Sequence, residues 1–577
     1  SFWRPLGRGT PTAESPDRPI IAVLPFENLG GAEDDYFADG MTDEITSRLA
    51  LMQGLGVISR TSSRKYEHTE KDVREIGKEL SADYIIEGTV RWDDSNGTER
   101  VRIAPRLIRV SDDTRVWTDT YEREITEIFS VQADISARIA EALDVTLLET
   151  ERRALTSQPT NNVDAYKAYL QGMKEVASPD FSRESFEHGI EMFEHAIALD
   201  PDFALAYARL ASMHSIMVHY GFDRTEKRKQ MAKRAVDRAF SLEPDLAEAH
   251  LALGYYYYWV YRDYDRALIE LEAAAKRRPD DSEILQATAY VKRRQGDLVS
   301  CAELLQRDLE LNPLDAAAAV SLGETYGTLR RYADAERSFQ NGIELAADNV
   351  YPYTELALMY LRWRGDVAAA RETLNRMPPV ANPESCRAWF FVDLLDRDYA
   401  SALKRLDSCP EEVLEAAVFF TPIPMLEGMA LRLAGDSARA RSAFEAARLI
   451  LEDKAARDPE DYRVHSALGI TYAGLGRLDD AASHGERAVE LYPISKDALE
   501  APVLVIDLAL TYTMIGHYDT ALERLGQVLS MPSILSASWL EEDPRWDPLR
   551  GRPDFAALLE KHRNEPGRWT APAVVHP

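Results

Sequence analysis

The chain has 577 residues, of which 45% are hydrophobic and 29% charged, and its formal net charge at pH 7 is −29. This composition is typical of a folded protein, and the length exceeds one ordinary globular core unless the fold is a repeat array. The acidic excess, without a Lys/Arg-rich run, argues against a phosphate-backbone ligand, so we expect no nucleic-acid partner. No apolar stretch reaches the length that a membrane helix needs.

The three cysteines, Cys301, Cys386 and Cys409, form no CxxC pair and belong to no Cys/His cluster with zinc-ligand spacing. We therefore predict no metal site. The simplest interpretation is three small buried apolar residues, which leaves the redox compartment open.

Residues 1–18 have the Gly, Pro, Ser and Thr content of a linker. The chain starts at Ser1 without a signal segment, so we expect a processed or truncated piece with something missing upstream. Trp3 beside Arg4 fits the exit of a preceding membrane helix, and it fits an arbitrary chain end equally well. A membrane tether upstream of Ser1 is therefore part of the hypothesis.

Residues 19–150 predict an α/β domain with a mixed sheet. Its first strand is the short apolar run Ile20 to Phe26, and Asn96-Gly97 is a strong hairpin-turn signal. The other expected elements are helices over 35–52, 73–80 and 125–148 and strands over 55–59, 83–92, 100–110 and 116–124.

Several blocks of this segment resemble the TolB-like (FlgO-like) N-terminal domain: IAVLPFENLGG, DYFADGMTDEI, ISRTSS, ADYIIEGTVR and VWTDTYERE. In bacteria, such a domain precedes tetratricopeptide (TPR) arrays in membrane signalling proteins, downstream of a cyclase, kinase or winged-helix effector. The resemblance implies that architecture for this chain.

From about residue 161 the pattern becomes helix-turn-helix. Its clearest unit runs from Ala247 to Pro279, with small residues at Gly254 and Ala267 that let two helices approach closely. The unit resembles the TPR repeat of about 34 residues, which needs neighbours to bury its apolar face. The resemblance implies an all-α right-handed TPR superhelix of about ten helical hairpins.

We place the first part of this array at 151–377 and the second at 378–535, because Pro-rich joints lie at 377–383 and 422–424. Residues 536–577 are expected to form a C-terminal cap and tail. In the cap, large apolar side chains would cover the last repeat: Trp546, Leu549, Phe555 and Leu558.

No phosphate-binding loop, dinucleotide fingerprint, zinc-protease motif, nucleophile elbow or kinase landmark is present. We therefore predict no catalytic, cofactor-binding or metal-binding residues and a chain that is not itself an enzyme. Acidic residues 33–35 beside Gly30-Gly31 have two interpretations: a helix cap, or a small-ligand site near Asn28 to Asp39.

The aromatic run Tyr255 to Tyr261 stands out. By the TPR resemblance Tyr257 fills a core position, whereas Tyr255, Tyr258 and Trp259 line the concave groove. Exposed rings there would suit an extended peptide or helix, because they bury a large area at low entropic cost. The alternative is that most of the run packs between repeats.

The leading hypothesis is a non-enzymatic scaffold whose TPR groove binds a protein or peptide segment in an envelope or signalling assembly. The alternative is the sensory or regulatory C-terminal region of a membrane cyclase or Ser/Thr kinase, with the catalytic domain upstream of this chain. We expect a periplasmic or membrane-associated location on the extracytoplasmic side, with the cytoplasm as the alternative. The protein would be a monomer or weak oligomer without cofactors.

Overall fold

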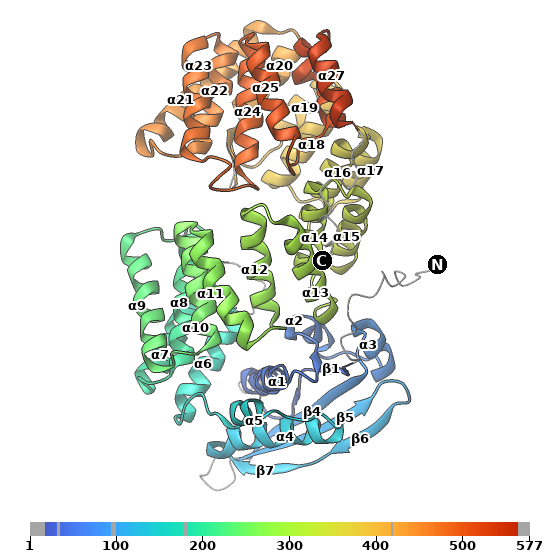
Figure 1. Cartoon of the computed structure of the whole chain (residues 1–577), viewed down its shortest axis with the longest axis vertical. Coiled ribbons are helices and arrows are strands. Elements are labelled where there is room, and N and C mark those ends of the chain that lie inside the picture. Colours follow the sequence, from blue (N-terminus) through green and yellow to red (C-terminus); the bar gives the residue numbers. More distant parts are fainter. Residues whose placement is uncertain (1–17, 32–34, 94–99, 177–181, 417–418, 564–577) are drawn as a thin grey trace, which may run out of the picture. The chain divides into compact units, whose positions relative to one another are not determined.

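The computed structural model describes residues 18–31, 35–93, 100–176, 182–416 and 419–563. They fall into two compact units (Figure 1). The first unit is Ser1–Thr288 with Arg307–Leu314, and the second is Ala289–Gln306 with Asp315–Pro577. The division passes through two consecutive helices, α12 (Ser282–Arg294) and α13 (Leu298–Leu311).

The first unit begins with a seven-stranded mixed sheet. Its strands are β1 (Ile20–Val23), β2 (Glu27–Asn28), β3 (Gly56–Val57), β4 (Tyr84–Asp93), β5 (Arg100–Arg109), β6 (Thr114–Thr118) and β7 (Tyr121–Glu124).

The order along the sheet is β3-β1-β4-β5-β6, with β2 beside β4 and β7 beside β5. Strands β1, β3 and β4 are parallel, and Val23 aligns with Ile86. Strands β4 and β5 pair antiparallel from Tyr84↔Arg109 to Asp93↔Arg100, as expected of a hairpin. Its predicted turn at Asn96-Gly97 lies outside the described residues. The mixed sheet confirms the predicted α/β class.

Helices cover both faces of this sheet (Figure 1). Successive side chains of β1 point to opposite faces of the sheet. Ile21 and Val23 lie on the face whose core includes residues of α1 and α4. Ala22 lies on the other face, whose core includes residues of α3. The helical segments of this region are α1 (Asp35–Leu49), α2 (Arg60–Ser63), η2 (Arg64–Tyr66), α3 (Val73–Leu80), η3 (Ile125–Glu127), α4 (Ile128–Ala142) and α5 (Glu149–Thr156).

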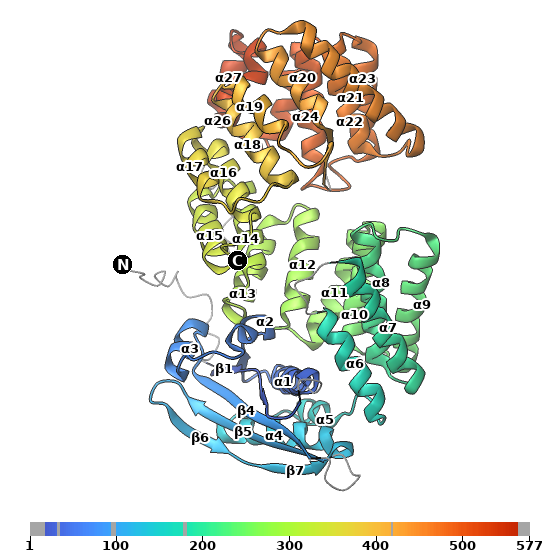
Figure 2. The ribbon, with the colours of Figure 1, turned by 180° about the vertical axis from the view of Figure 1, so that it is seen from behind.

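Ten consecutive helical hairpins follow in the described part of the chain, which confirms the TPR-type repeat array (Figure 2). In the first unit they comprise α6 (Val163–Val176), α7 (Arg183–Leu199), α8 (Ala204–His219), α9 (Glu226–Leu242), α10 (Ala247–Tyr255), a π-helix η4 (Tyr256–Tyr261) and α11 (Tyr264–Arg277). Helices α12 and α13 form the next hairpin.

The second unit continues the array with six more hairpins. Their helices are α14 (Ala316–Thr328), α15 (Tyr332–Leu345), α16 (Tyr351–Arg364), α17 (Val367–Arg376), α18 (Pro383–Leu395), α19 (Tyr399–Leu406), α20 (Ile423–Leu433), α21 (Ser437–Arg457), α22 (Tyr462–Leu475), α23 (Leu478–Leu491), α24 (Ala501–Met514) and α25 (Tyr518–Leu529). The chain closes with α26 (Ala537–Glu542), η5 (Pro544–Leu549) and α27 (Pro553–His562).

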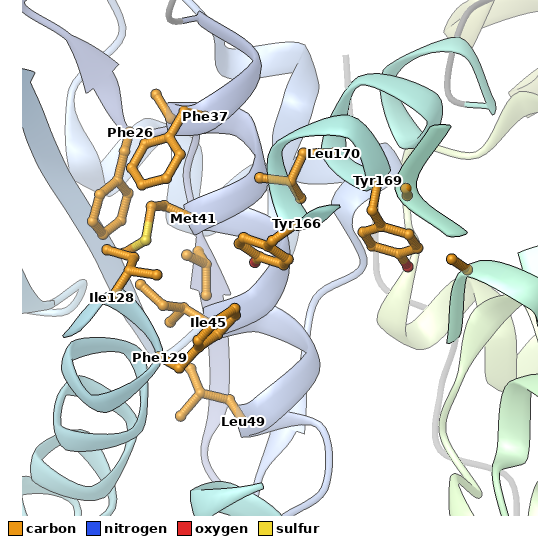
Figure 3. Packing of buried hydrophobic residues seen from close by; sticks show 14 of the residues in the cluster. Phe26, Phe37, Met41, Ile45, Leu49, Ile128, Phe129, Tyr166, Tyr169 and Leu170 are labelled. Carbon is orange, nitrogen blue, oxygen red and sulfur yellow. The ribbon is translucent and has the colours of Figure 1, made fainter. Parts of the chain in front are cut away.

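The α/β domain and the first hairpins share one hydrophobic core. Figure 3 shows Phe37 and Met41 of α1 near Phe26 and Ile128, and Tyr166 and Leu170 of α6 packed against α1 in the same core. The contact is close, because a side chain on Gly40 would collide with Leu170. The sheet domain is therefore joined to the array by packing as well as by the chain.

The end of α13 also returns to the α/β domain within the first unit. The backbone amide of Ser59 donates to the Leu311 carbonyl at 2.7 Å, and the Leu314 amide donates to the Ser62 hydroxyl at 3.0 Å. These bonds explain why Arg307–Leu314 belongs to the first unit although its sequence neighbours belong to the second.

The second unit contains an element that the helical pattern did not predict. Between α19 and α20 a short hairpin pairs β8 (Val413–Glu415) with β9 (Phe420–Pro422). Pro422 ends β9 and Pro424 lies in the first turn of α20, so the Pro-rich segment is a strand-to-helix junction. In the cap Trp546, Leu549 and Phe555 are buried, as expected of side chains that cover a repeat face.

Two further predictions need correction. The single strand expected over 116–124 is split into β6 and β7, which pair with different parts of β5. The three cysteines are not simply buried apolar residues: Cys386 and Cys409 form a disulfide with a Cα–Cα distance of 6.0 Å, while Cys301 is free and buried. Their separation of 23 residues gave no sequence signal for pairing. Among the described helices, none is long and apolar enough to cross a membrane.

The close approach of α22 and α23 generates a stability prediction. A side chain on Gly469 would lie 3.1 Å from the backbone nitrogen of Gly485, which cannot move aside as a rotamer can. Gly469→Val should therefore lower the free energy of unfolding by about 1–3 kcal/mol or more through overpacking. Denaturant unfolding checks this.

The matched control is Gly327→Ala in α14, where a new side chain meets nothing within 4 Å. It should gain about 0.5–1 kcal/mol, because alanine is the better helix former. Equal effects of the two substitutions would contradict the packing argument.

The disulfide gives a chemical prediction. Of the three cysteines in the sequence, one thiol should react with an alkylating reagent under denaturing, non-reducing conditions, and all three should react after reduction. Intact-mass spectrometry distinguishes the two patterns. Three reactive thiols before reduction, in protein purified under oxidising conditions, would contradict the bond.

Candidate functional sites

The predicted aromatic run does not continue the α-helix that precedes it. Helix α10 ends at Tyr255, the next six residues form the π-helix η4, and Arg262 ends it with a left-handed φ of 52°. A π-turn is wider than an α-turn and is frequent at functional sites. The wider turn also invalidates groove positions assigned from α-helical spacing beyond Tyr255.

The structure buries more of this run than expected. Tyr255 and Tyr258 are each 8% exposed, whereas Tyr257 and Trp259 are partly exposed. The Tyr257 ring lies beneath the Arg266 guanidinium. The exposed-ring interpretation was therefore wrong for Tyr255 and Tyr258. That Tyr255, Tyr258 and Trp259 contact a protein stays a prediction.

Tyr255 is part of a buried polar network. The Tyr255 hydroxyl lies next to Glu283. The Glu283 carboxylate also forms an ion pair with Arg209 of α8, at 2.8 Å. Burial, and then the nearby Glu283 charge, raise the pKa of Tyr255 well above its usual value. The Tyr255 hydroxyl is therefore buried in the fold and is not available to a partner.

A continuous row of rings reaches the surface from this network. The Tyr255 ring stacks on Trp259 with ring centroids 3.9 Å apart, and Trp259 stacks on His219 at 5.3 Å. His219 contacts Tyr220 edge-on at 5.2 Å, and Tyr220 stacks on Phe186 at 5.9 Å. We call these five residues the aromatic strip. Tyr220 is 48% exposed and His219 is also exposed, so the strip offers aromatic surface across consecutive hairpins.

Beside the strip lies a basic helix in an acidic protein. Helix α9 carries six basic residues and two acidic ones, whereas the whole chain has a net charge of −29. Lys229 of α9 lies over the Tyr261 ring at 5.9 Å, which places this charge next to the π-helix. In the sequence these residues form no long uninterrupted Lys/Arg run, so their position on one helix becomes evident only in the structure.

His214 of α8 lies where α8 meets this basic helix. It is 1% exposed, and its Nδ1 is 3.1 Å from the Arg228 guanidinium. Burial, and then the Arg228 charge, lower the pKa of His214 to about 4. The imidazole is therefore neutral at physiological pH.

The second unit contains a cavity of about 410 Å³. The first helices of six consecutive hairpins line it (α14, α16, α18, α20, α22 and α24), together with the β8–β9 hairpin. Its apolar wall includes Phe391, Phe419, Phe420, Met425 and Ile470. The volume is within the range of about 300–1,000 Å³ that is typical of small-ligand pockets.

Six arginines also line this cavity, and five of them have a carboxylate partner. The ion pairs are Arg293 with Glu324 (2.7 Å), Arg294 with Glu500, Arg362 with Glu355 (3.5 Å), Arg463 with Asp461 (2.8 Å) and Arg545 with Asp543 (2.6 Å). The sixth, Arg387, lies over the rings of Phe391 and Phe419.

Another cavity, of about 380 Å³, lies in the α/β domain after strand β1. Asn28, Asp35 and Asp39 line it, together with Lys71 and Arg106. This is the region where the sequence predicted a small-ligand site, at the carboxyl end of a parallel strand. Ligand binding there stays a prediction. Within the described residues, no group of three or more His, Cys, Asp or Glu could hold a metal ion.

Comparison with known proteins gives partial matches. Residues 17–138 match the family described as HilA/YgeH-like transcriptional regulator, second domain. Over 202 residues the chain is 33% identical to the putative adenylate cyclase 3 of Rhizobium meliloti (strain 1021), a match that covers 35% of this chain and 33% of that protein. The match thus spans about a third of the relative's length.

Among solved structures, the human IFIT1 dimer with m7Gppp-AAAA has a TM-score of 0.35 and 17% identity, and the match covers 63% of this chain and 77% of IFIT1. YrrB, a TPR protein with an unusual peptide-binding site, has a TM-score of 0.27 and 20% identity over 32% of this chain and 91% of its own.

The buried histidine gives a pH prediction. The folded-state pKa of His214 lies below the value of 6.5 for an unfolded histidine. The contribution of His214 to the free energy of unfolding is therefore complete above pH 6.5 and is lost as the pH falls toward 4. The full loss corresponds to roughly 3 kcal/mol. His214→Gln should therefore flatten the acid side of the stability profile, measured by thermal unfolding between pH 7 and 4.

The effect must be taken as a difference from the wild type. Burial raises the pKa of Asp43 in the same unit to about 7, so that carboxyl acts with the opposite sign and its contribution is lost as the pH rises toward 7. A surface-histidine variant, His195→Gln, provides the control. An unchanged acid slope in His214→Gln would count against the assignment.

Proposed function

We propose that this chain is a non-enzymatic binding region whose TPR array holds a protein segment within an envelope or signalling assembly. The observation that carries the proposal is the aromatic strip, which crosses consecutive hairpins and includes the exposed rings of His219 and Tyr220. Exposed aromatic residues in rows are typical of interface centres rather than of ordinary solvated surface.

The charge beside the strip defines the partner further. Helix α9 carries an excess of basic residues in a protein of net charge −29. Arg228, Lys229, Lys233 and Arg238 form ion pairs, so the exposed positive charge comes from Lys227 and Arg234. An acidic segment with aromatic or aliphatic side chains would be attracted to this helix and could pack on the rings. A basic segment or nucleic acid fits less well, because the rest of the chain carries an acidic excess.

We further propose that residues 19–150 form a TolB-like domain and that the protein lies on the extracytoplasmic side, on a membrane tether. The sequence blocks given above support the first part. The Cys386–Cys409 disulfide supports the second, since such bonds persist in oxidising compartments.

A second candidate is the sensory or regulatory region of a cyclase, with the catalytic domain outside this chain. The similarity to a putative adenylate cyclase favours it. The two functions are compatible, because a regulatory region also works by binding. The gene sequence upstream of Ser1 discriminates between them: a cyclase domain there would make the regulatory role the leading one.

Removal of one ring tests the scaffold proposal. Trp259→Ala should reduce capture of a partner from native lysate by about tenfold or more, as expected for an interface anchor. Lys227→Glu with Arg234→Glu, two exposed charges of α9, should weaken capture of the same protein and reduce its salt dependence. Quantitative mass spectrometry of the captured proteins provides the measurement.

Leu449→Ala is the control, because Leu449 is 60% exposed and belongs to the other unit. It should leave capture unchanged, and a thermal melt should show that Trp259→Ala remains folded. A partner profile that neither the ring nor the charge substitutions alter would overturn the proposed surface.

A further inference from the structure

One arginine of the second unit's cavity, Arg387, differs from the others in its surroundings. Within the described residues Arg387 forms no ion pair, although the five other arginines of the cavity do. Its guanidinium lies 5.4 Å from the Phe391 ring centroid and 5.0 Å from that of Phe419. Burial lowers the pKa of Arg387, which means that its charge is poorly solvated.

The same cavity contains an anion in a comparable state. Asp507 of α24 accepts a 2.8 Å hydrogen bond from the Ser466 hydroxyl and, within the described part of the chain, forms no ion pair. Burial raises the pKa of Asp507 above its usual value. Arg387 and Asp507 each shift the other's pKa through space, yet they do not pair directly.

Both residues are partly buried, and each charge faces the cavity without an ion-pair partner among the described residues. Such partly dehydrated charges are incompletely compensated. An ion pair between them would offset part of the cost of dehydration. A molecule that carries both charges would instead bridge them. The phenylalanine rings beside Arg387 provide an apolar surface for the remainder of such a molecule.

We propose that this cavity binds a small zwitterion, an α-amino acid or short peptide with an apolar side chain. Its carboxylate would pair with Arg387, its ammonium group with Asp507, and its side chain would pack on Phe391, Phe419 and Phe420. The site lies in the other unit from the aromatic strip and is independent of the protein-binding proposal. It would give the array a means of sensing a metabolite.

The test is titration calorimetry on the full chain with four probes. L-Phenylalanine and the dipeptide of two phenylalanines carry both charges, whereas phenylpropanoate and phenylethylamine carry one each. At least one zwitterion should bind about tenfold or more tighter than either single-charge analogue, because a charge-assisted hydrogen bond is lost with each missing group. Whichever of the two zwitterions binds more tightly shows whether the cavity prefers a free amino acid or a peptide.

Variants then assign each charge. Arg387→Gln should bring the affinity of the zwitterion down to that of phenylethylamine, and Asp507→Asn should bring it down to that of phenylpropanoate. Arg441→Gln and Asp479→Asn, exposed residues of the same unit, serve as matched controls and should bind like the wild type. If a cavity variant fails to fold, the wild-type comparison of the four probes still decides. Absence of binding by both zwitterions, or equal binding of all four probes, would overturn the proposal.

Discussion

The array depends on how closely the two helices of each hairpin approach. In several hairpins a glycine of the first helix faces a bulky side chain of the second: Gly172 faces Phe193, Gly323 faces Phe339 and Gly428 faces Phe444. A side chain on any of these glycines would lie within 3 Å of the ring. This contact sets the spacing of the helices. The side chains of the first helices are thereby left free to line surfaces and cavities.

The repeated contact also explains what the sequence could predict. Small and large residues recur at helical spacing, so the array of ten hairpins and the class of the preceding domain could be inferred without a structure. The β8–β9 hairpin could not, since it is short and interrupts a helical pattern. Nor could the Cys386–Cys409 bond, because pairing depends on a spatial proximity that sequence separation does not reveal.

The candidate sites were harder to predict than the fold. The sequence indicated Tyr255, Tyr258 and Trp259 as groove residues. The directions of Tyr258 and Trp259 depend on the π-helix, whose wider turn rotates each following side chain relative to an α-helix. Arg387 is one of many arginines in the sequence. Only the structure shows that the other arginines of the cavity are paired and that Arg387 has no ion pair within the described residues. Such information arises from the sum of contacts rather than from any motif.

The disulfide has a consequence for the kinetics of recognition. Cys386 directly precedes Arg387 on α18, and Cys409 leads into the hairpin that carries Phe419 and Phe420. The cross-link therefore limits the motion of two walls of the cavity before anything enters it. A pre-organised wall loses little conformational entropy upon association, so encounter rather than rearrangement would set the rate. Reduction of the bond would restore that freedom and make recognition slower and weaker.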